Sequence, residues 1–386
     1  MATVVVAPYN VVTCPEVGGH FHVYMQYAQG LRLLGCDVYW LETFLGTGDA
    51  AADAALVRNF LRRMEGFGLS GKVILHAPGH PEGPFLGLAT PAAEAVLRRA
   101  DLLLNFAYRI DPALLARFRR TALIDIDPGL LQFWISAGQI TVPRHDLYFT
   151  TGETVGTAGA LFPDCGLPWV RIRPSVCLEC WPYTYDPRCE AFTTISSWWG
   201  DEWITDGVET YENNKRVTFL EFIEVPKRAG QVLELALYLG EGDRADLERL
   251  ARHGWRVRHS LEVAAGPEAY QAYIRGSRGE FSCAKPSCMK FQNAWVSDRS
   301  LCYLASGKPV VVQDTGPSAY LPNGEGMFRF KTVAEAVGAL ETVNADYERH
   351  CRAAREIAEA HFDARKVLAG VLNTALGAAP LLARRA

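Results

Sequence analysis

Several features that mark specialised classes of protein are missing from this sequence. No apolar run reaches the eighteen or so residues that a membrane-spanning helix needs, so we expect no integral membrane segment. Neither sign of charge dominates, because 39 Lys and Arg oppose 43 Asp and Glu and leave a net charge of −4 at pH 7. Without a global basic field, nucleic acid is not expected as a partner.

Signals for export and for metal binding are also missing. The first ten residues, MATVVVAPYN, carry no basic stretch before a short apolar run, which predicts a first strand rather than a signal peptide, and a cytoplasmic protein. Of the ten cysteines only Cys177 and Cys180 form a CxxC pair, and no second pair follows at the spacing of a zinc finger. We therefore expect reduced, packed thiols and no metal site.

The chain does have enough apolar material for two domains. Its 386 residues exceed the size at which one core keeps growing, and 49% of them are hydrophobic. In the first half, β-branched runs alternate with helical patterns, which predicts βαβ units and a parallel, doubly wound sheet. The predicted strands are 3–7, 37–41, 73–76, 102–106, 122–126 and 147–150, and the predicted helices are 21–34 and 51–64.

The alternation returns after a middle segment of different character. Residues 176–214 hold several tryptophans without a period, which predicts a loop-rich connector whose aromatic rings pack between domains or line a cleft. Beyond it, the predicted strands are 217–222, 255–259, 280–284, 309–313 and 327–330, and the predicted helices are 232–239, 245–253, 266–274, 300–305 and most of 334–359. The predicted fold class is α/β, with two Rossmann-like domains, 1–175 and 215–365, facing across a cleft, and a C-terminal helix over 366–386.

The first candidate site follows the first predicted strand. Gly18 and Gly19 introduce a helix whose N-terminus offers unpaired N–H groups and the positive end of a dipole. His20 stands in or beside the first turn, where its ring would take a proton from a hydroxyl near neutral pH; a packed, structural histidine is the alternative, and His22 is expected to pack. The stretch is neither GxGxxG nor a P-loop, which argues against dinucleotide or triphosphate binding.

The second candidate site lies within residues 279–326. A short helix begins at a Ser-Asp cap with a cation in its first turn, an arrangement that suits a diphosphate. Polar residues directly after the next strand stand where a sugar or ribose hydroxyl would be held, and a nearby lysine, Lys285 or Lys290, adds charge in place of a metal. Ordinary caps and a turn are the alternative. The candidate residues are Lys285, Ser297, Asp298, Arg299, Ser300, Asp314, Thr315 and Gly316.

These segments resemble GT-B glycosyltransferases. The stretch SDRSLCYLASGKPVVVQDTG resembles their donor-nucleotide segment, where a short helix before A-x-G-x-P-V-V takes the diphosphate of a nucleotide sugar. GGHFHVYMQYAQGLRLLGCDVYWLE is similar to their N-terminal segment, above all in peptidoglycan glucosaminyltransferase and antibiotic glycosyltransferases, and AREIAEAHFDARKVLAGVL resembles their C-terminal helices. The resemblance implies a metal-independent hexosyltransferase that uses a nucleotide-diphosphate sugar, with donor domain 215–365 and acceptor domain 1–175. The implied acceptor is a small molecule, a natural product or a cell-envelope precursor.

The resemblance also implies roles for single residues. His20 would deprotonate the acceptor, Asp127 would orient His20 or bind an acceptor hydroxyl, and Gly18 and Gly19 would let the chain pass close to the donor. The E-x7-E pattern of many retaining members is absent from residues 290–298, so the stereochemistry stays open, with His20 favouring inversion.

Other interpretations of the sequence also stay open. Asp125-Ile126-Asp127 matches the metal motif of GT-A glycosyltransferases, and it also fits a structural turn. For the whole chain, a sugar-nucleotide 2-epimerase of the same fold and a non-catalytic nucleotide- or sugar-binding module are the alternative functions.

Overall fold

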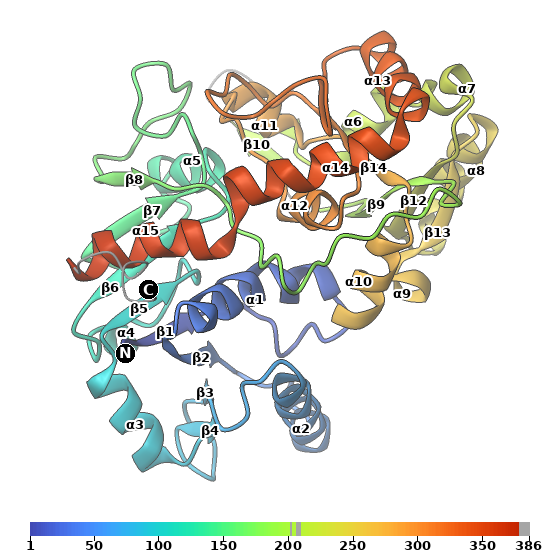
Figure 1. Ribbon diagram of the computed structural model, residues 1–386. Coiled ribbons are helices and arrows are strands. Elements are labelled where there is room, and N and C mark those ends of the chain that lie inside the picture. Colours follow the sequence, from blue (N-terminus) through green and yellow to red (C-terminus); the bar gives the residue numbers. More distant parts are fainter. Residues whose placement is uncertain (201–202, 206–209, 378–386) are drawn as a thin grey trace. The chain divides into compact units, whose positions relative to one another are not determined.

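Figure 1 shows the computed structural model, which describes residues 1–200, 203–205 and 210–377. The chain divides into two compact units. Unit 1 comprises Met1–Gly156, Pro163–Cys177 and the C-terminal segment from Ala364, and unit 2 comprises Thr157–Phe162 and Leu178–Asp363. Both units are α/β with largely parallel sheets, which confirms the predicted fold class.

Unit 1 is built on one eight-stranded sheet. Its strand order is β4 (Phe85–Gly87), β3 (Val73–His76), β2 (Asp37–Thr43), β1 (Thr3–Ala7), β5 (Leu102–Asn105), β6 (Thr121–Asp125), β7 (Leu147–Thr150) and β8 (Trp169–Arg171). All neighbours are parallel except β3 and β4. The order changes direction between β1 and β5, and ligands of doubly wound sheets bind outside the carboxyl ends of the strands at such a switch point.

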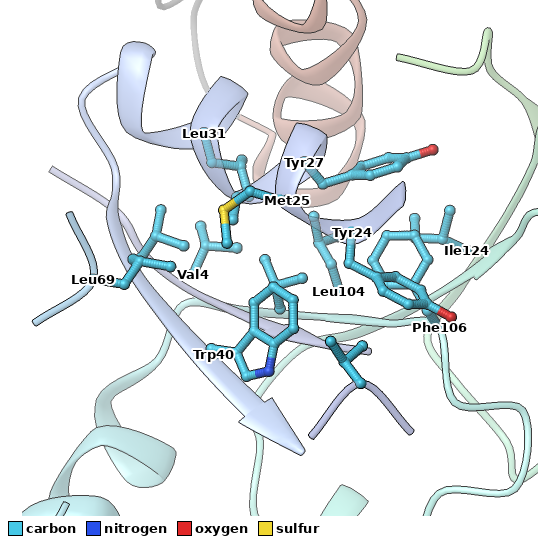
Figure 2. Close-up of a cluster of buried hydrophobic side chains, with 14 of the residues drawn as sticks. Val4, Tyr24, Met25, Tyr27, Leu31, Trp40, Leu69, Leu104, Phe106 and Ile124 are labelled. Atoms are coloured by element: carbon cyan, nitrogen blue, oxygen red, sulfur yellow. The ribbon is translucent and has the colours of Figure 1, made fainter. Parts of the chain in front are cut away.

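Both faces of this sheet are buried under helices. Val4 and Val6 point into a core that contains α1 (Gly18–Leu33), α2 (Ala50–Gly66) and α15 (Ala364–Leu376). Figure 2 shows part of this core, where Tyr24, Tyr27 and Leu31 of α1 lie with Trp40 of β2. The opposite face carries α3 (Thr90–Arg99) and α4 (Pro112–Leu115), and the remaining helix of this unit's first stretch is α5 (Leu130–Ser136). Apolar residues on both faces of β1 explain why TVVVA is an uninterrupted run.

Unit 2 holds a six-stranded sheet whose neighbouring strands are all parallel. The strand order is β13 (Arg256–His259), β12 (Leu233–Tyr238), β9 (Phe192–Ser197), β14 (Gly279–Ser282), β15 (Val310–Gln313) and β16 (Met327–Phe330). Its helices are α6 (Lys215–Glu221), α7 (Val225–Ala229), α8 (Arg244–Arg252), α9 (Ser260–Val263), α10 (Gly266–Arg275), α11 (Pro286–Phe291), α12 (Asp298–Ala305), α13 (Val333–Ala345) and α14 (Tyr347–Ile357). A two-stranded ribbon, β10 (Trp203–Thr205) and β11 (Thr210–Glu212), precedes α6. The switch point of this sheet lies between β9 and β14.

Three segments differ from the sequence-based expectation. The predicted strand 217–222 lies in helix α6, and the predicted helix 232–239 is strand β12. Both are short apolar runs, for which periodicity alone does not separate helix from strand. The third difference is the predicted connector 176–214, which contains strands β9, β10 and β11, and β9 is a central strand of unit 2.

The tryptophans of that segment serve mainly as core of unit 2. Trp181 and Trp198 are fully buried, and the Trp198 indole donates to Asp246 at 2.9 Å. Trp199 is half-exposed and lies against the Arg216 guanidinium. The side chain of Trp203 lies outside the described residues.

Candidate functional site

A buried ion pair marks the switch point of unit 2. Arg299, on the first turn of α12, donates to Glu280 of β14 at 2.7 Å, and their side chains are 9% and 0% exposed. The same guanidinium donates to the Ile195 carbonyl of β9 at 2.8 Å and to Ser282 Oγ at 2.6 Å. Arg299 therefore fastens α12 to both strands that flank the switch point. Protein groups thus bind the Arg299 guanidinium, whereas from the sequence we expected it to bind a diphosphate.

Lys215 is the residue of this site that the sequence analysis missed. It is the half-buried first residue of α6, and its ammonium lies 5.9 Å from the centre of the Trp295 ring. Burial, followed by the nearby charge of Arg299, lowers the pKa of Lys215 to about 7, against an opposing effect of Glu280. The polar residues directly before residue 217 could have identified Lys215 as the start of a helix. The incorrect prediction of a strand over 217–222 left them in the connector instead. An added anion at this place would favour the charged ammonium.

The start of α12 faces a small cavity. Ser297 is the N-cap residue, its side chain makes no capping hydrogen bond, and Asp298 opens the helix. Ser297 and buried Ser300 line the cavity together with Ser282 at the end of β14. Lys285 is the N-cap of α11, and its charge acts on Lys215. The structure thus brings Lys285, Ser297 and Ser300 to the same end of the sheet as Lys215.

The polar residues after β15 hold loops together. Asp314 pairs with Arg329 and, at 3.4 Å, with Lys331. Thr315 Oγ1 donates to the Trp295 carbonyl at 2.7 Å. Gly316 has φ +128°, and a Cβ there would stand 2.6 Å from the Gln292 carbonyl oxygen, so only glycine fits. These contacts form a wall next to α12.

In unit 1, His20 lies on the first turn of α1, beside the switch point between β1 and β5. Its Nε2 is 2.6 Å from the Tyr9 carbonyl oxygen. Because a carbonyl only accepts, Nε2 carries the hydrogen, and Nδ1 is the basic atom of the neutral ring. Burial lowers the pKa of His20, partly countered by the Tyr9 carbonyl and by the charge of Asp127. His22 is buried against Phe21 and Phe67, as expected.

The two aspartates after β6 differ in their environments. Asp125 is fully buried and accepts from Gln132 at 2.8 Å and from Thr150 at 2.7 Å, and burial raises its pKa to about 6. Asp127 is exposed, and the Tyr108 hydroxyl lies 3.3 Å from it. A carboxylate as enclosed as Asp125 does not suit the metal motif of GT-A enzymes. Asp127 instead acts on His20 through its charge.

A cavity of about 400 Å³ opens at the carboxyl ends of β1, β2 and β3 in unit 1. Tyr9, Asn10, His76 and Arg109 line it, and Glu42 forms part of its wall. Glu42 is buried and accepts from the backbone N–H groups of Val11 and Val12 at 2.6 and 2.9 Å. Tyr9 connects the cavity to His20, because Tyr9 lines the cavity and its carbonyl accepts the hydrogen bond from His20.

No protein-family model and no curated protein matches the chain, whereas solved structures do. An α-glucosyltransferase in complex with UDP shares 12% identity over 97% of this chain and 99% of its own, with a TM-score of 0.63. AviGT4, a glycosyltransferase involved in avilamycin A biosynthesis, shares 14% over 98% and 99%, with a TM-score of 0.53. The chain has the GT-B fold. At these identities the likeness concerns the fold, and it confirms the resemblance drawn from the sequence.

One expectation from the sequence is contradicted. The α-glucosyltransferase is also solved with UDP-glucose and DNA containing an abasic site, at 10% identity over 97% of this chain and 99% of its own and a TM-score of 0.63. Excluding nucleic acid as a partner from the net charge was therefore wrong, because a protein of the same fold is solved with DNA. Net charge is an average over the chain, and phosphate binding requires only a local basic surface.

Two further expectations concern metals and membranes. Among the described residues, no three His, Cys, Asp or Glu side chains are grouped so that they could hold a metal ion. Within the same ranges, every helix is too short or too polar to cross a bilayer.

Proposed function

We propose that this GT-B protein is a glycosyltransferase that moves a sugar from a UDP-sugar to a hydroxyl or amine acceptor without a metal. The observation that carries the proposal is Lys215 beside the buried Glu280–Arg299 pair, at the switch point of unit 2. A leaving diphosphate needs positive charge, and Lys215 and Lys285 supply it at the place where α/β sheets bind ligands. UDP or UDP-glucose in the similar structures supports the choice of nucleotide.

The donor contacts follow from this arrangement. Lys215 binds the diphosphate as an ammonium, because the anion offsets the burial that lowers its pKa in the free protein. Ser300 and the first N–H groups of α12 meet the phosphate oxygens. Arg299 does not bind the donor itself in this proposal. Its ion pair with Glu280 fixes the position of α12 against β14. A 2-epimerase should carry more carboxylates near the donor helix, whereas Glu280 and Asp314 here are both paired with arginines.

The acceptor chemistry belongs to unit 1. His20 Nδ1 takes the proton of the acceptor hydroxyl, while Tyr9 fixes the ring through Nε2 and Asp127 stabilises the imidazolium that forms. The cavity beside Tyr9 takes the acceptor. We infer a natural product or cell-envelope precursor, and the likeness to AviGT4 supports the former.

A nucleotide screen followed by one substitution tests the proposal. UDP should raise the melting temperature more than ADP, GDP or dTDP. A ligand that binds only the folded protein, at 100 times its Kd, adds about 2.7 kcal/mol to the free energy of unfolding. His20→Ala should retain the UDP shift and lose about 100-fold or more in UDP release from UDP-glucose, the usual contribution of a general base. If none of the nucleotides stabilises the protein, the proposed donor site is wrong. Loss of the UDP shift in His20→Ala would make His20 a phosphate ligand instead.

A further inference from the structure

Lys308 is a fully buried lysine that forms no ion pair with a carboxylate among the described residues, although the charge of Asp186 acts on it. It lies in the tight turn between α12 and β15, and its side chain is 0% exposed. Among the residues that the structure describes, its Nζ has one hydrogen-bond partner, the Sγ of Cys189 at 3.9 Å. A buried ammonium is costly unless an anion accompanies it. Burial accordingly lowers the pKa of Lys308, which increases the share of neutral amine.

Both partners are held in place by their backbones. The Cys189 N–H donates to the Asp186 carbonyl, and the Cys189 carbonyl accepts from Arg278, each at 3.2 Å. The Lys308 N–H donates to the Tyr303 carbonyl at 2.9 Å. Cys189 is partly exposed, so we expect a small oxidant to reach its sulfur from solvent, while the lysine side chain is fully buried. The pair thus combines an accessible thiol with an enclosed amine in contact with it.

We propose that oxidation joins Cys189 Sγ to Lys308 Nζ in a reversible covalent cross-link. A peroxide first converts the thiol to a sulfenic acid: the sulfur gains oxygen and loses two electrons, and the peroxide is reduced to water. The lone pair of the Lys308 amine then attacks the sulfur, an S–N bond forms, and the hydroxyl leaves with one amine proton as a second water. A dithiol reductant restores the thiol and the amine. This proposal does not depend on the glycosyltransferase activity.

Cys351 is a competitor for the sulfenic acid. Its thiol interacts electrostatically with both Cys189 and Lys308. It is buried, however, and burial raises the pKa of Cys351 to about 11. Thiol exchange requires the thiolate, which is scarce at neutral pH when the pKa is that high. The amine of Lys308 is therefore the better placed nucleophile.

Peptide mapping of the full chain tests the cross-link. After treatment with hydrogen peroxide and digestion with trypsin, peptides 189–215 and 300–329 should be joined, because Pro309 blocks cleavage after Lys308. The joined mass equals the sum of the two peptides less two hydrogen atoms, and dithiothreitol should separate them. A joined pair with one further oxygen between nitrogen and sulfur also supports the site.

Substitutions identify the atoms involved. Peptide 300–329 also contains Cys302, so Cys302→Ser must keep the link, and so must Cys351→Ser. Cys189→Ser and Lys308→Arg should each abolish it, with Lys308→Met as a second variant if the arginine unfolds the protein. A link that persists without Lys308 would overturn the proposal. So would a disulfide from Cys189 to peptide 350–352, or oxidation of Cys189 without any link.

Discussion

Lys215 lies beside a carboxylate and a guanidinium that already neutralise each other. Among the described residues it forms no ion pair of its own, and burial, followed by the charge of Arg299, keeps its pKa low. A diphosphate would complete the charge balance, which is why a single cation at this place is worth more than one on the surface.

Replacing Lys215 by methionine should therefore weaken UDP-glucose binding about 10- to 100-fold, since a hydrogen bond to a charged group contributes roughly 1.5–3 kcal/mol. The affinity of the wild-type protein should fall as the pH rises through about 7, because the free enzyme then loses the ammonium that the ligand needs. In Lys215→Met this dependence should flatten. Isothermal titration calorimetry from pH 6 to pH 8 measures both effects.

Lys227→Met is the matched control, because it removes the same charge from an exposed position on α7 of the same unit. Its affinity for UDP-glucose should equal that of the wild type at every pH. An unchanged affinity in Lys215→Met would contradict the donor site.

Single residues also show the limit of sequence reasoning. The start of α12 was located correctly, because a Ser-Asp cap before an apolar stripe has a local cause. The partners of Arg299 were not predicted, since Glu280 and Ile195 reach it through the packing of strands distant in the sequence.

At the scale of elements, α1 and α15 illustrate how closely two helices approach in unit 1. Figure 1 shows them side by side, and Gly30 of α1 lies against Ala364 and Leu368 of α15. A Cβ at this position would lie 2.6 Å from both Ala364 Cβ and Leu368 Cδ1. Gly370, on α15, is exposed and has no neighbour within 4 Å of such a Cβ.

The same substitution at these two glycines should have opposite effects. Gly30→Ala should lower the free energy of unfolding by about 1–3 kcal/mol through overpacking. Gly370→Ala should raise it by about 0.5–1 kcal/mol, because alanine loses less backbone entropy in a helix. Urea denaturation measures both. If both substitutions change the free energy of unfolding equally, the close approach of α1 and α15 at Gly30 contributes nothing to stability.

The strands that the sequence predicted well are short runs of β-branched, aliphatic and aromatic residues. Strands 3–7, 73–76, 147–150 and 327–330 agree with the structure residue for residue. Tertiary packing explains why a predicted strand is helix α6 and a predicted helix is strand β12. β12 is enclosed between β9 and β13, so a run of alternating leucines became a central strand.

At the scale of the whole molecule, the charges of the proposed donor site come from side chains. Lys215 and Lys285 belong to unit 2, and Asp125, the buried carboxylate of the D-x-D stretch in unit 1, is enclosed by Gln132 and Thr150. We therefore expect UDP release from UDP-glucose to be unchanged by EDTA and by added Mg²⁺ or Mn²⁺. Loss of turnover in EDTA that Mn²⁺ restores would contradict metal independence.

The position of α15 has a consequence for how the protein is made. Ala364, Leu368, Val371 and Leu372 complete the core of unit 1, yet the ribosome adds them only after all of unit 2. The usual vectorial order, in which the N-terminal domain folds first, is therefore reversed in its last step. The apolar side chains of unit 1 that α15 covers therefore stay uncovered while Leu178–Asp363 is translated.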